Sequence, residues 1–437
     1  MSGRPTNSRP VRVLVLDHTA QLGGAELALV RLVAALDPAR VSVRVLLFSD
    51  GPLVGRLRQL GVPVRVLRLD ERTRTTERSA VLGGPVRTAR AAWRVAPFVV
   101  RLAREIRASK ADVVHATSLK ADLLALPAAA LARRPLVWHV HDLLTAQYLG
   151  ARLATVVRAL AAVGPHAVVV NSAATAATVP HRAGAVVAPP GLAPEQVRER
   201  LPPPRGSAPV VGIVGRISPT KGQDVFLRAA ALVAARRPDV RFRIVGAALF
   251  AEQGFADEVA ALVGRLGLAG RVELAGFVDD PATAMDALDV VVHASPVAEP
   301  FGQVVAEAMA RGVPVVATRG GGVDEIVEPE GVAPLGRLVP PGDPAALADA
   351  VLATLADDGR EATARRASAE VAARFPISRT AAVVTEVWER AGGRTCGRTA
   401  AVSGESGAST ANLAGHGPTI DAPGRVTDRD PSPGRSA

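Results

Sequence analysis

Short apolar runs alternate with alanine-rich stretches along most of the chain. The runs are rich in Val, Ile and Leu, and the stretches between them have the spacing of amphipathic helices, which is typical of parallel βαβ units. The expected strands of the first half are residues 11–16, 42–48, 64–69, 113–115, 136–140 and 167–171. Those of the second half are residues 210–214, 240–245, 272–275, 290–293, 314–317 and 336–338. The pattern therefore predicts an α/β protein with two Rossmann-like parallel-sheet domains.

A proline-rich stretch separates the two series of strands. Seven prolines lie between residues 189 and 209, and each removes a backbone hydrogen-bond donor. We expect residues 1–190 to form the N-terminal domain, 191–209 the linker and 210–376 the C-terminal domain, followed by a helix over 377–391. Beyond that helix Gly, Ser, Thr and Pro dominate without apolar periodicity, so residues 392–437 are predicted to form a disordered tail.

Composition and charge narrow the range of partners. Aromatic residues make up only 3% of the 437 residues, too few for base-stacking platforms, so we expect no nucleic-acid binding despite the formal net charge of +11. The charge is uneven, because residues 1–206 carry 29 basic and 13 acidic side chains, whereas residues 207–391 carry 18 and 24. The first half therefore suits a phosphorylated acceptor or an anionic membrane surface.

Cysteine usage and the N-terminal sequence bear on the compartment. The single cysteine, Cys396, permits no disulfide within one chain, which is typical of a reducing environment. The apolar run at residues 13–16 is too short for the core of a signal peptide. We expect a cytoplasmic protein, with peripheral contact at the inner face of the plasma membrane as one alternative.

Two acids in the second half lie eight residues apart, in the segment EPFGQVVAEAMARGVPVVAT that begins at Glu299. Pro300 disfavours a helix at Glu299, so that carboxylate is expected on a loop, whereas Glu307 falls within a helix over residues 303–311. In one continuous helix this spacing is ~12 Å of rise, too far for the paired carboxylates of a glycosidase. The arrangement suits one extended ligand, with Gly302 and the helix N-terminus facing its phosphates and Glu307 facing its ribose.

Two cations follow the first expected strand of the second half. The motif GRISPTKG places Arg216 and Lys221 after strand 210–214, at the end of a parallel strand where open sheets bind ligands. Lysine occurs only at positions 110, 120 and 221, which suggests a specific role for Lys221. A diphosphate is the expected ligand, and an ordinary solvated pair of cations is the alternative.

A glycine run follows the strand expected at residues 314–317. Gly321 and Gly322 offer backbone amides, without Cβ obstruction, to the phosphates or the sugar of the same ligand. The glycine runs of this chain do not match GxGxxG, which disfavours a dinucleotide fold of the dehydrogenase kind.

Two motifs in the first half are candidates for an acceptor side. Gly23 and Gly24 open a helix after the first strand, where a glycine loop either faces a phosphate or an acceptor or forms an ordinary turn. His141 follows strand 136–140 and precedes Asp142, which makes it a candidate for contacting the sugar or the acceptor. The other histidines considered are expected to be structural: His115, His139, His166 and His293.

Residues 85–107 form an arginine-rich helical stretch, which Pro97 is expected to break. On a helix, its arginines fall within an arc of roughly 100° opposite an apolar stripe. The arginines of this face are Arg87, Arg90, Arg94, Arg101 and Arg104. The face is either the solvated side of a domain helix or, with Trp93 near it, a surface that docks on anionic lipid.

Together and in this order, the motifs resemble the retaining glycosyltransferases of family 4, which have the GT-B architecture. The resemblance spans about residues 11–390 and rests on the GGAE loop, His141-Asp142, Asn171-Ser172, GRISPTKG, GFVDD at 276–280, the pair Glu299 and Glu307, and the GGG loop. It implies two domains that face each other across a cleft, with the final helix returning to the first domain. It also implies transfer of a hexose from a nucleotide-diphosphate sugar to a hydroxyl of a glycan or lipid-linked acceptor, with no metal or other cofactor.

The resemblance also implies roles for the donor side. Arg216 and Lys221 bind the diphosphate, Glu307 binds the ribose, and Glu299 contacts the transferred sugar as a candidate catalytic residue. The cations and the helix end neutralise the leaving diphosphate.

On the acceptor side, the resemblance implies that Gly24 and His141 complete the site, with His141 as the second candidate catalytic residue. One departure is Pro189-Pro190-Gly191, where members often have Asn before the Gly, and this weakens the match at the linker. Two alternatives remain open: a non-catalytic nucleotide-sugar-binding protein of the same fold, and another GT-B enzyme such as an epimerase or phosphorylase. The oligomeric state, the base and the sugar are not predicted.

Overall fold

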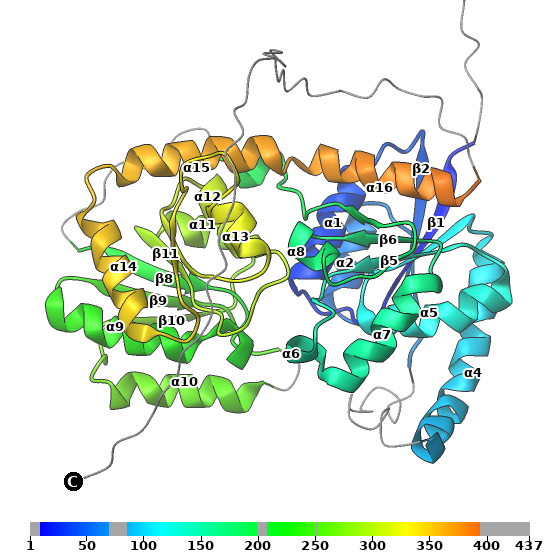
Figure 1. Ribbon diagram of the computed structural model, residues 1–437, viewed down its shortest axis with the longest axis horizontal. Coiled ribbons are helices and arrows are strands. Elements are labelled where there is room, and N and C mark those ends of the chain that lie inside the picture. Colours follow the sequence, from blue (N-terminus) through cyan, green and yellow to red (C-terminus); the bar gives the residue numbers. More distant parts are fainter. Residues whose placement is uncertain (1–8, 70–84, 199–207, 250–251, 394–437) are drawn as a thin grey trace, which may run out of the picture. The chain divides into compact units, whose positions relative to one another are not determined.

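The structure, a computed structural model, describes residues 9–69, 85–198, 208–249 and 252–393 and folds them around two parallel sheets (Figure 1). The first sheet has seven strands in the order β3-β2-β1-β4-β5-β6-β7. Their bounds are Val11–Asp17 (β1), Val41–Leu47 (β2), Val64–Val66 (β3), Val113–Ala116 (β4), Leu136–Val140 (β5), Ala167–Val170 (β6) and Ala185–Val187 (β7). Helices cover both faces of such a sheet, which is why its central strands are mostly apolar.

The second sheet has six strands in the order β10-β9-β8-β11-β12-β13. Their bounds are Val210–Val214 (β8), Arg241–Val245 (β9), Val272–Gly276 (β10), Val290–His293 (β11), Val315–Thr318 (β12) and Arg337–Val339 (β13). In each sheet the strand order reverses next to the first strand, between β1 and β4 and between β8 and β11. Open parallel sheets bind ligands at the carboxyl ends of strands at such reversals. The predicted pair of Rossmann-like parallel sheets is confirmed.

The helices connect successive strands. Around the first sheet lie α1 (Gly24–Ala34), α2 (Pro52–Gln59), α4 (Pro85–Ser109), α5 (Leu119–Ala132), α6 (Ala146–Leu149), α7 (Ala151–Val163) and α8 (Ala173–Ala176). Around the second lie α9 (Gln223–Arg236), α10 (Gln253–Arg265), α11 (Pro281–Asp286), α12 (Gln303–Ala310), α13 (Gly322–Val327), α14 (Pro344–Ala356) and α15 (Arg360–Arg374). The last helix is α16 (Ile377–Ala391).

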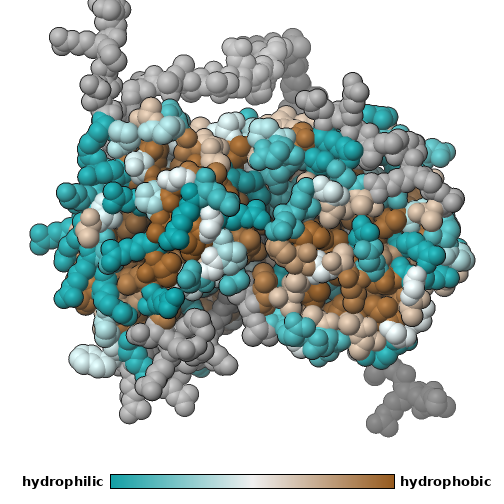
Figure 2. Space-filling model, turned by 180° about the vertical axis from the view of Figure 1, so that it is seen from behind, coloured by the Kyte–Doolittle hydropathy of each residue, from teal (hydrophilic) through white to brown (hydrophobic). Residues whose placement is uncertain are grey.

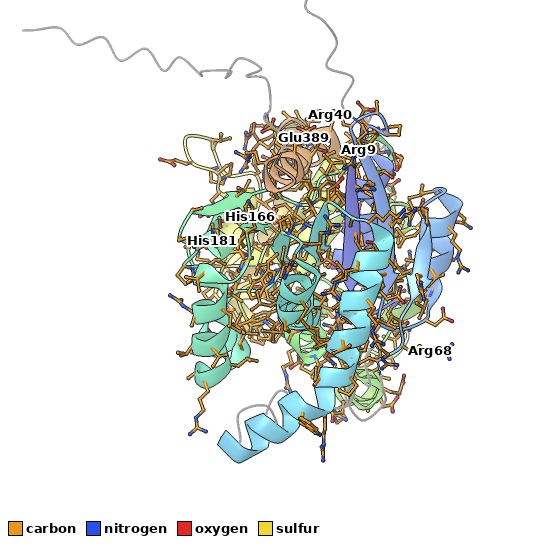
Figure 3. All side chains as sticks on the ribbon, turned by 90° about the vertical axis from the view of Figure 1, so that its right-hand side faces the viewer. Arg9, Arg40, Arg68, His166, His181 and Glu389 are labelled. Atoms are coloured by element: carbon orange, nitrogen blue, oxygen red, sulfur yellow. The ribbon has the colours of Figure 1, made fainter. Side chains whose placement is uncertain are left out.

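The final helix α16 packs against the first domain, beside α1 and across β1, β5 and β6 (Figure 1). Its Trp388 is fully buried there and donates a hydrogen bond from Nε1 to Nδ1 of His115 at 3.1 Å. Near its end, Glu389 pairs with Arg40 at 2.7 Å, and the two side chains lie together in Figure 3. After the second domain the chain therefore returns to the first domain, where α16 forms part of the core.

Four local predictions differ from the structure. The strand β7 was not predicted, because three residues next to a proline-rich stretch carry almost no periodic signal. The strand expected at 64–69 ends at Val66. Pro97 does not break α4, because it lies on an exposed side of the helix, where the carbonyl that loses its partner can bond to water.

The fourth difference concerns the proline-rich linker, which makes more regular contacts than expected. Pro194–Gln196 form a single 3₁₀ turn. The amide of Leu192 donates to Phe375 and the amide of Ile377 donates back to the Leu192 carbonyl, so the two passes between the domains form a short parallel bridge. The prolines do not occupy the positions that make these bonds.

The cores are filled mainly by Val, Leu and Ala, as the low aromatic content predicts. Most of the predicted tail, residues 392–437, and Cys396 lie outside the described residues. The surface in Figure 2 is largely polar, with apolar side chains gathered between the polar ones. Within the described part of the chain, none of the helices combines the length and apolarity needed to cross a membrane.

Candidate active site

A cavity of about 1620 Å³ lies at the carboxyl ends of strands from both sheets. His18 follows β1, Thr117 follows β4, Gly215 follows β8 and His293 ends β11, and all four line the cavity. These strands flank the two reversals of strand order. The fold therefore brings both ligand-binding edges to one space, as expected for domains that face each other across a cleft.

Most of the predicted site residues line this cavity. They are Gly23, Gly24, His141, Arg216, Lys221, Glu299, Gly302 and Glu307. Gly321 and Gly322 are not among the lining residues, and their predicted contact with the donor stays a prediction. A Cβ at Gly321 would lie 2.0 Å from the Glu299 carbonyl oxygen, and the amide of Gly322 donates to that oxygen at 2.9 Å. These two glycines pack against the backbone of the Glu299 loop and support it.

Lys221 and Glu299 lie side by side in the cavity. The Lys221 Nζ is 2.5 Å from Glu299 Oε1, and the side chains are 31% and 14% exposed. Lys221 ends a single 3₁₀ turn, and Gly222 follows with φ of +70°. A Cβ at Gly222 would lie 2.0 Å from the Ala294 carbonyl oxygen, so only glycine allows this turn to pack against the chain after β11.

The electrostatics of Glu299 depend on two cationic or polar neighbours. Burial opposes ionisation of this carboxyl, but the Lys221 ammonium and His293 outweigh that effect and hold the pKa of Glu299 well below its usual range. The Nε2 atom of His293 lies 3.7 Å from Glu299 Oε1, while its Nδ1 lies 3.2 Å from the Thr318 hydroxyl. Glu299 is therefore a carboxylate at neutral pH, ready to accept hydrogen bonds from hydroxyl groups.

His293 was expected to be structural, but it lines the cavity beside Glu299. It is buried, and its Nε2 has no hydrogen-bond partner among the described residues. The apolar residues before His293 predict a position in the core. The signal for a cavity position is that His293 is the last residue of a parallel strand. Of the other histidines expected to be structural, His115 and His139 are buried in the first domain, whereas His166 is exposed.

Glu307 faces the first domain across the cavity. Its carboxylate lies 3.3 Å from an Nη1 atom of Arg31 on α1 and accepts a hydrogen bond from Gln196 at 3.1 Å. Arg31 also donates to Gln303 at 2.7 Å and to the Gly191 carbonyl at 3.1 Å. Burial raises the pKa of Glu307, although Arg31 and Gln196 act in the opposite direction. Glu307, the residue predicted to bind the ribose, thus has an arginine partner from the other domain. Nothing in the spacing of the sequence predicts this pair.

Arg216, the second predicted cation, lines the cavity after β8. Its Nη1 lies 2.7 Å from Glu252, which also accepts a hydrogen bond from the Ser218 hydroxyl at 2.9 Å. Gln223 donates to the Arg216 carbonyl at 2.8 Å and so fixes the loop. In the described residues, no three His, Cys, Asp or Glu side chains gather as a metal site would require.

The predicted acceptor loop approaches the second domain. A Cβ at Gly24 would lie 3.2 Å from the side-chain amide of Gln303 at the start of α12. The rings of His139 and His141 are 4.2 Å apart, and His141 lines the cavity. Burial lowers the pKa of His141 despite the nearby carboxylates of Asp142 and Asp17, so the imidazole is neutral at pH 7.

Glu26 is a cavity residue that sequence reasoning did not single out. It lies in the first turn of α1, is buried, and folds back so that a Cβ at Gly23 would meet its Oε2 at 2.5 Å. Burial and the nearby Asp17 raise the pKa of Glu26 to about 7. Acids are common in first helical turns because they suit the helix dipole, so the sequence alone did not mark this one.

Two further contacts join the domains beside the Glu299 loop. The Ser172 hydroxyl donates to the Pro300 carbonyl oxygen at 2.5 Å. The Glu325 carboxylate of α13 accepts from the amides of Ala173 and Ala174, at 3.1 and 2.6 Å. The loop that carries Glu299 is therefore supported by both domains.

Both halves of the chain match family models. Residues 22–196 match the model described as Glycosyltransferase Family 4, and residues 208–357 match the model Glycosyl transferases group 1. The crystal structure of Anabaena Alr3699/HepE in complex with UDP and glucose superposes with a TM-score of 0.73, at 30% identity over 86% of this chain and 99% of that chain. This chain belongs to glycosyltransferase family 4. The two sheets and the cavity between them are the GT-B architecture of such glycosyltransferases.

Curated relatives of this family 4 glycosyltransferase match a shorter region. D-inositol 3-phosphate glycosyltransferase 2 of Catenulispora acidiphila is 39% identical over 196 residues, which cover 44% of each protein. Phosphatidyl-myo-inositol mannosyltransferase of Mycobacterium leprae is 36% identical over 173 residues, which cover 39% of this chain and 43% of that protein. The chain thus matches less than half the length of these two relatives.

Proposed function

We propose that this chain is a retaining glycosyltransferase that moves a hexose from a nucleotide-diphosphate sugar to a hydroxyl of a glycan or lipid-linked acceptor, without a metal ion. The observation that carries the proposal is the pair Lys221 and Glu299, 2.5 Å apart in a cavity that both sheets line. The pair offers a cation to a diphosphate next to a carboxylate for sugar hydroxyls. HepE, a similar protein, has been crystallised with UDP and with UDP-glucose, so uridine diphosphate sugars are the first donors to test.

The residues at the cavity suit a leaving diphosphate. Departure of this group builds negative charge, which fixed cations and a helix N-terminus stabilise most when they are already in place. Arg216, Lys221 and the start of α12 at Gly302 line the cavity. In this proposal they supply the charge neutralisation that a metal ion provides in other transferases.

The acceptor side suits attack by the acceptor hydroxyl on the same face of the sugar from which the diphosphate leaves. In our proposal the sugar passes through an oxocarbenium-like state, and a phosphate oxygen of the donor takes the proton of the acceptor hydroxyl. Glu299 accepts hydrogen bonds from the sugar, and the neutral imidazole of His141 orients a hydroxyl of the sugar or the acceptor. Closure of the two domains excludes water and limits hydrolysis of the donor.

The proposal is tested by following consumption of UDP-, GDP- and ADP-sugars by mass spectrometry, with and without acceptors and with and without EDTA. We expect transfer with retained anomeric configuration that EDTA does not abolish. Glu299→Gln should keep its nucleotide affinity by calorimetry but slow transfer ~100-fold or more. The exposed Glu330→Gln is the matched control and should keep wild-type rates.

Three outcomes would overturn the proposal. Donor binding without turnover would favour a non-catalytic binding protein. Donor conversion that needs no acceptor would favour an epimerase. A wild-type transfer rate for Glu299→Gln would show that the Glu299 carboxylate has no role in the reaction.

A further inference from the structure

The cavity continues from the Glu299 region into an apolar section of the first domain. This section lies between α4, α5 and the region of α6 and α7. Its lining includes Val99, Leu123, Leu124, Pro127, Tyr148 and Leu153. A nucleotide sugar and a free sugar acceptor are polar and gain little from hydrocarbon walls. A volume of about 1620 Å³ also exceeds the space of roughly 300–1,000 Å³ that one small ligand occupies.

The apolar wall reaches the protein surface. Val100 of α4 is 43% exposed, Leu131 of α5 is 49% exposed, and both line the cavity. Trp93, two turns before Val100 on α4, is 82% exposed. Figure 3 shows α4 crossing the side of the first domain that faces the viewer. Large exposed apolar side chains around the mouth of a cavity indicate contact with an apolar partner.

Among the described residues, two cations and one carboxylate, Asp142 of the loop after β5, line this part of the cavity. The charged residues that α4 and α5 contribute to the lining, in their described parts, are Arg94 and Lys120. The buried Asp122 of α5 does not offset them, because burial and the nearby carboxylates of Asp142 and Asp17 raise its pKa well above the usual value. An anionic group beside a hydrocarbon chain therefore finds cations and apolar walls together.

We propose that the acceptor is a membrane lipid whose sugar or polyol head group is joined to its hydrocarbon by a phosphate. The hydrocarbon lies between α4 and α5, the phosphate lies near Arg94 and Lys120, and the head-group hydroxyl reaches the donor sugar. Trp93 lies next to Arg94 on α4 and is exposed, and an indole ring suits the boundary between lipid and water. This inference rests on the proposed glycosyl transfer and names its acceptor class.

The experiment compares acceptors in detergent micelles that share one phosphorylated head group and differ in chain length. For wild-type protein, the long-chain acceptor should have a KM at least ~10-fold lower than a short, water-soluble one, because burial of two methylene groups already gives that factor. Leu131→Glu should raise the KM of the long-chain acceptor ~10-fold or more, since it places a carboxylate at the mouth. Leu232→Glu is the matched control, on an exposed helix position of the second domain outside the cavity, and should leave all rates unchanged.

A second arm tests the phosphate. The double variant Arg94→Gln and Lys120→Gln should lower the preference for a phosphate-linked lipid over an uncharged alkyl glycoside with the same chain ~10-fold or more. Lys110→Gln, an exposed lysine outside the cavity, is its control. Thermal unfolding of each variant within a few degrees of its control establishes that it is folded.

The outcomes separate this inference from the proposed function. Transfer with equal KM for long and short acceptors, or equal effects of Leu131→Glu and Leu232→Glu, would overturn the lipid site and leave the transferase standing. A preference that survives removal of both cations would overturn the phosphate contact. Absence of donor turnover with every acceptor would instead overturn the proposed function.

Discussion

Lys221→Met removes the ammonium group that lies 2.5 Å from Glu299 and keeps the length and apolar stem of the side chain. If the ammonium binds the donor diphosphate, its loss removes a charge-assisted contact of about 1.5–3 kcal/mol. We therefore expect nucleoside diphosphate to bind about 10- to 150-fold more weakly. The change should be larger for the diphosphate than for the nucleoside monophosphate, because the base and ribose contacts remain.

The same substitution leaves the Glu299 carboxylate without its cation. The pair is partly exposed on the lysine side, at 31%, so the loss of folding stability should be below the ~3–5 kcal/mol of a fully buried pair, at about 1–3 kcal/mol. The pKa of Glu299 should rise toward its ordinary value, and the acidic limb of the pH–rate profile should move to higher pH. The double variant Lys221→Met and Glu299→Gln should regain much of the stability, because it no longer buries a lone charge.

Isothermal titration calorimetry with the nucleotide that wild type binds measures the affinity, and urea unfolding measures the stability. Lys110→Met is the matched control, because it makes the same chemical change at an exposed lysine outside the cavity. If Lys221→Met and Lys110→Met bound the diphosphate equally well, Lys221 would be a structural partner of Glu299 and the donor assignment would be refuted.

Further substitutions test the interdomain contact, the buried acid and the tight turn. Arg31→Met should cost about 1–3 kcal/mol in urea unfolding, because it leaves the largely buried Glu307 carboxylate without its cation, and adding Glu307→Gln should recover part of the loss. The pKa of Glu26 is raised from 4.5 to about 7, so the folded state binds its proton more tightly and loses stability as pH rises through that range. Glu26→Gln should therefore gain up to about 3 kcal/mol at pH 8 and little at pH 4.5, whereas equal gains at both would contradict the burial argument. Gly222→Ala should lower the melting temperature by more than ~5 °C or prevent folding, since its Cβ would overlap a backbone oxygen, while Gly254→Ala, with open space around it, should not destabilise.

Much of the fold could be predicted because the central strands are buried on both faces. Such strands consist of continuous β-branched or Leu-rich runs, and the runs at 136–140, 210–214 and 290–293 coincide with β5, β8 and β11. The edge strand β7 could not be found in this way, since three residues with partial exposure have no distinctive pattern. The prediction that Pro97 breaks the helix was wrong for another reason. The free-energy cost of a proline inside a helix depends on whether the carbonyl that loses its partner can bond to water, and the sequence does not give that exposure.

The candidate site could be predicted where its residues follow strands. Arg216, Lys221, Glu299 and His141 all occupy the carboxyl ends of strands or the loops after them, and they line one cavity. Residues whose role depends on the other domain could not be found, because nothing in local spacing connects them. Arg31 is the clearest example, since it lies on α1 and meets Glu307 of the second domain.

The position of α16 has a consequence for any attempt to divide this chain. Residues 377–391 leave the second domain and fill the core of the first with Val384, Val387 and Trp388, so the N-terminal half alone is not a self-sufficient folding unit. A fragment that stopped at the linker would expose the apolar groove that this helix occupies, and a synthetic copy of the helix supplied in trans should bind there. Rotation of one half against the other must also bend two adjoining segments of backbone at once, where Leu192 meets Pro376.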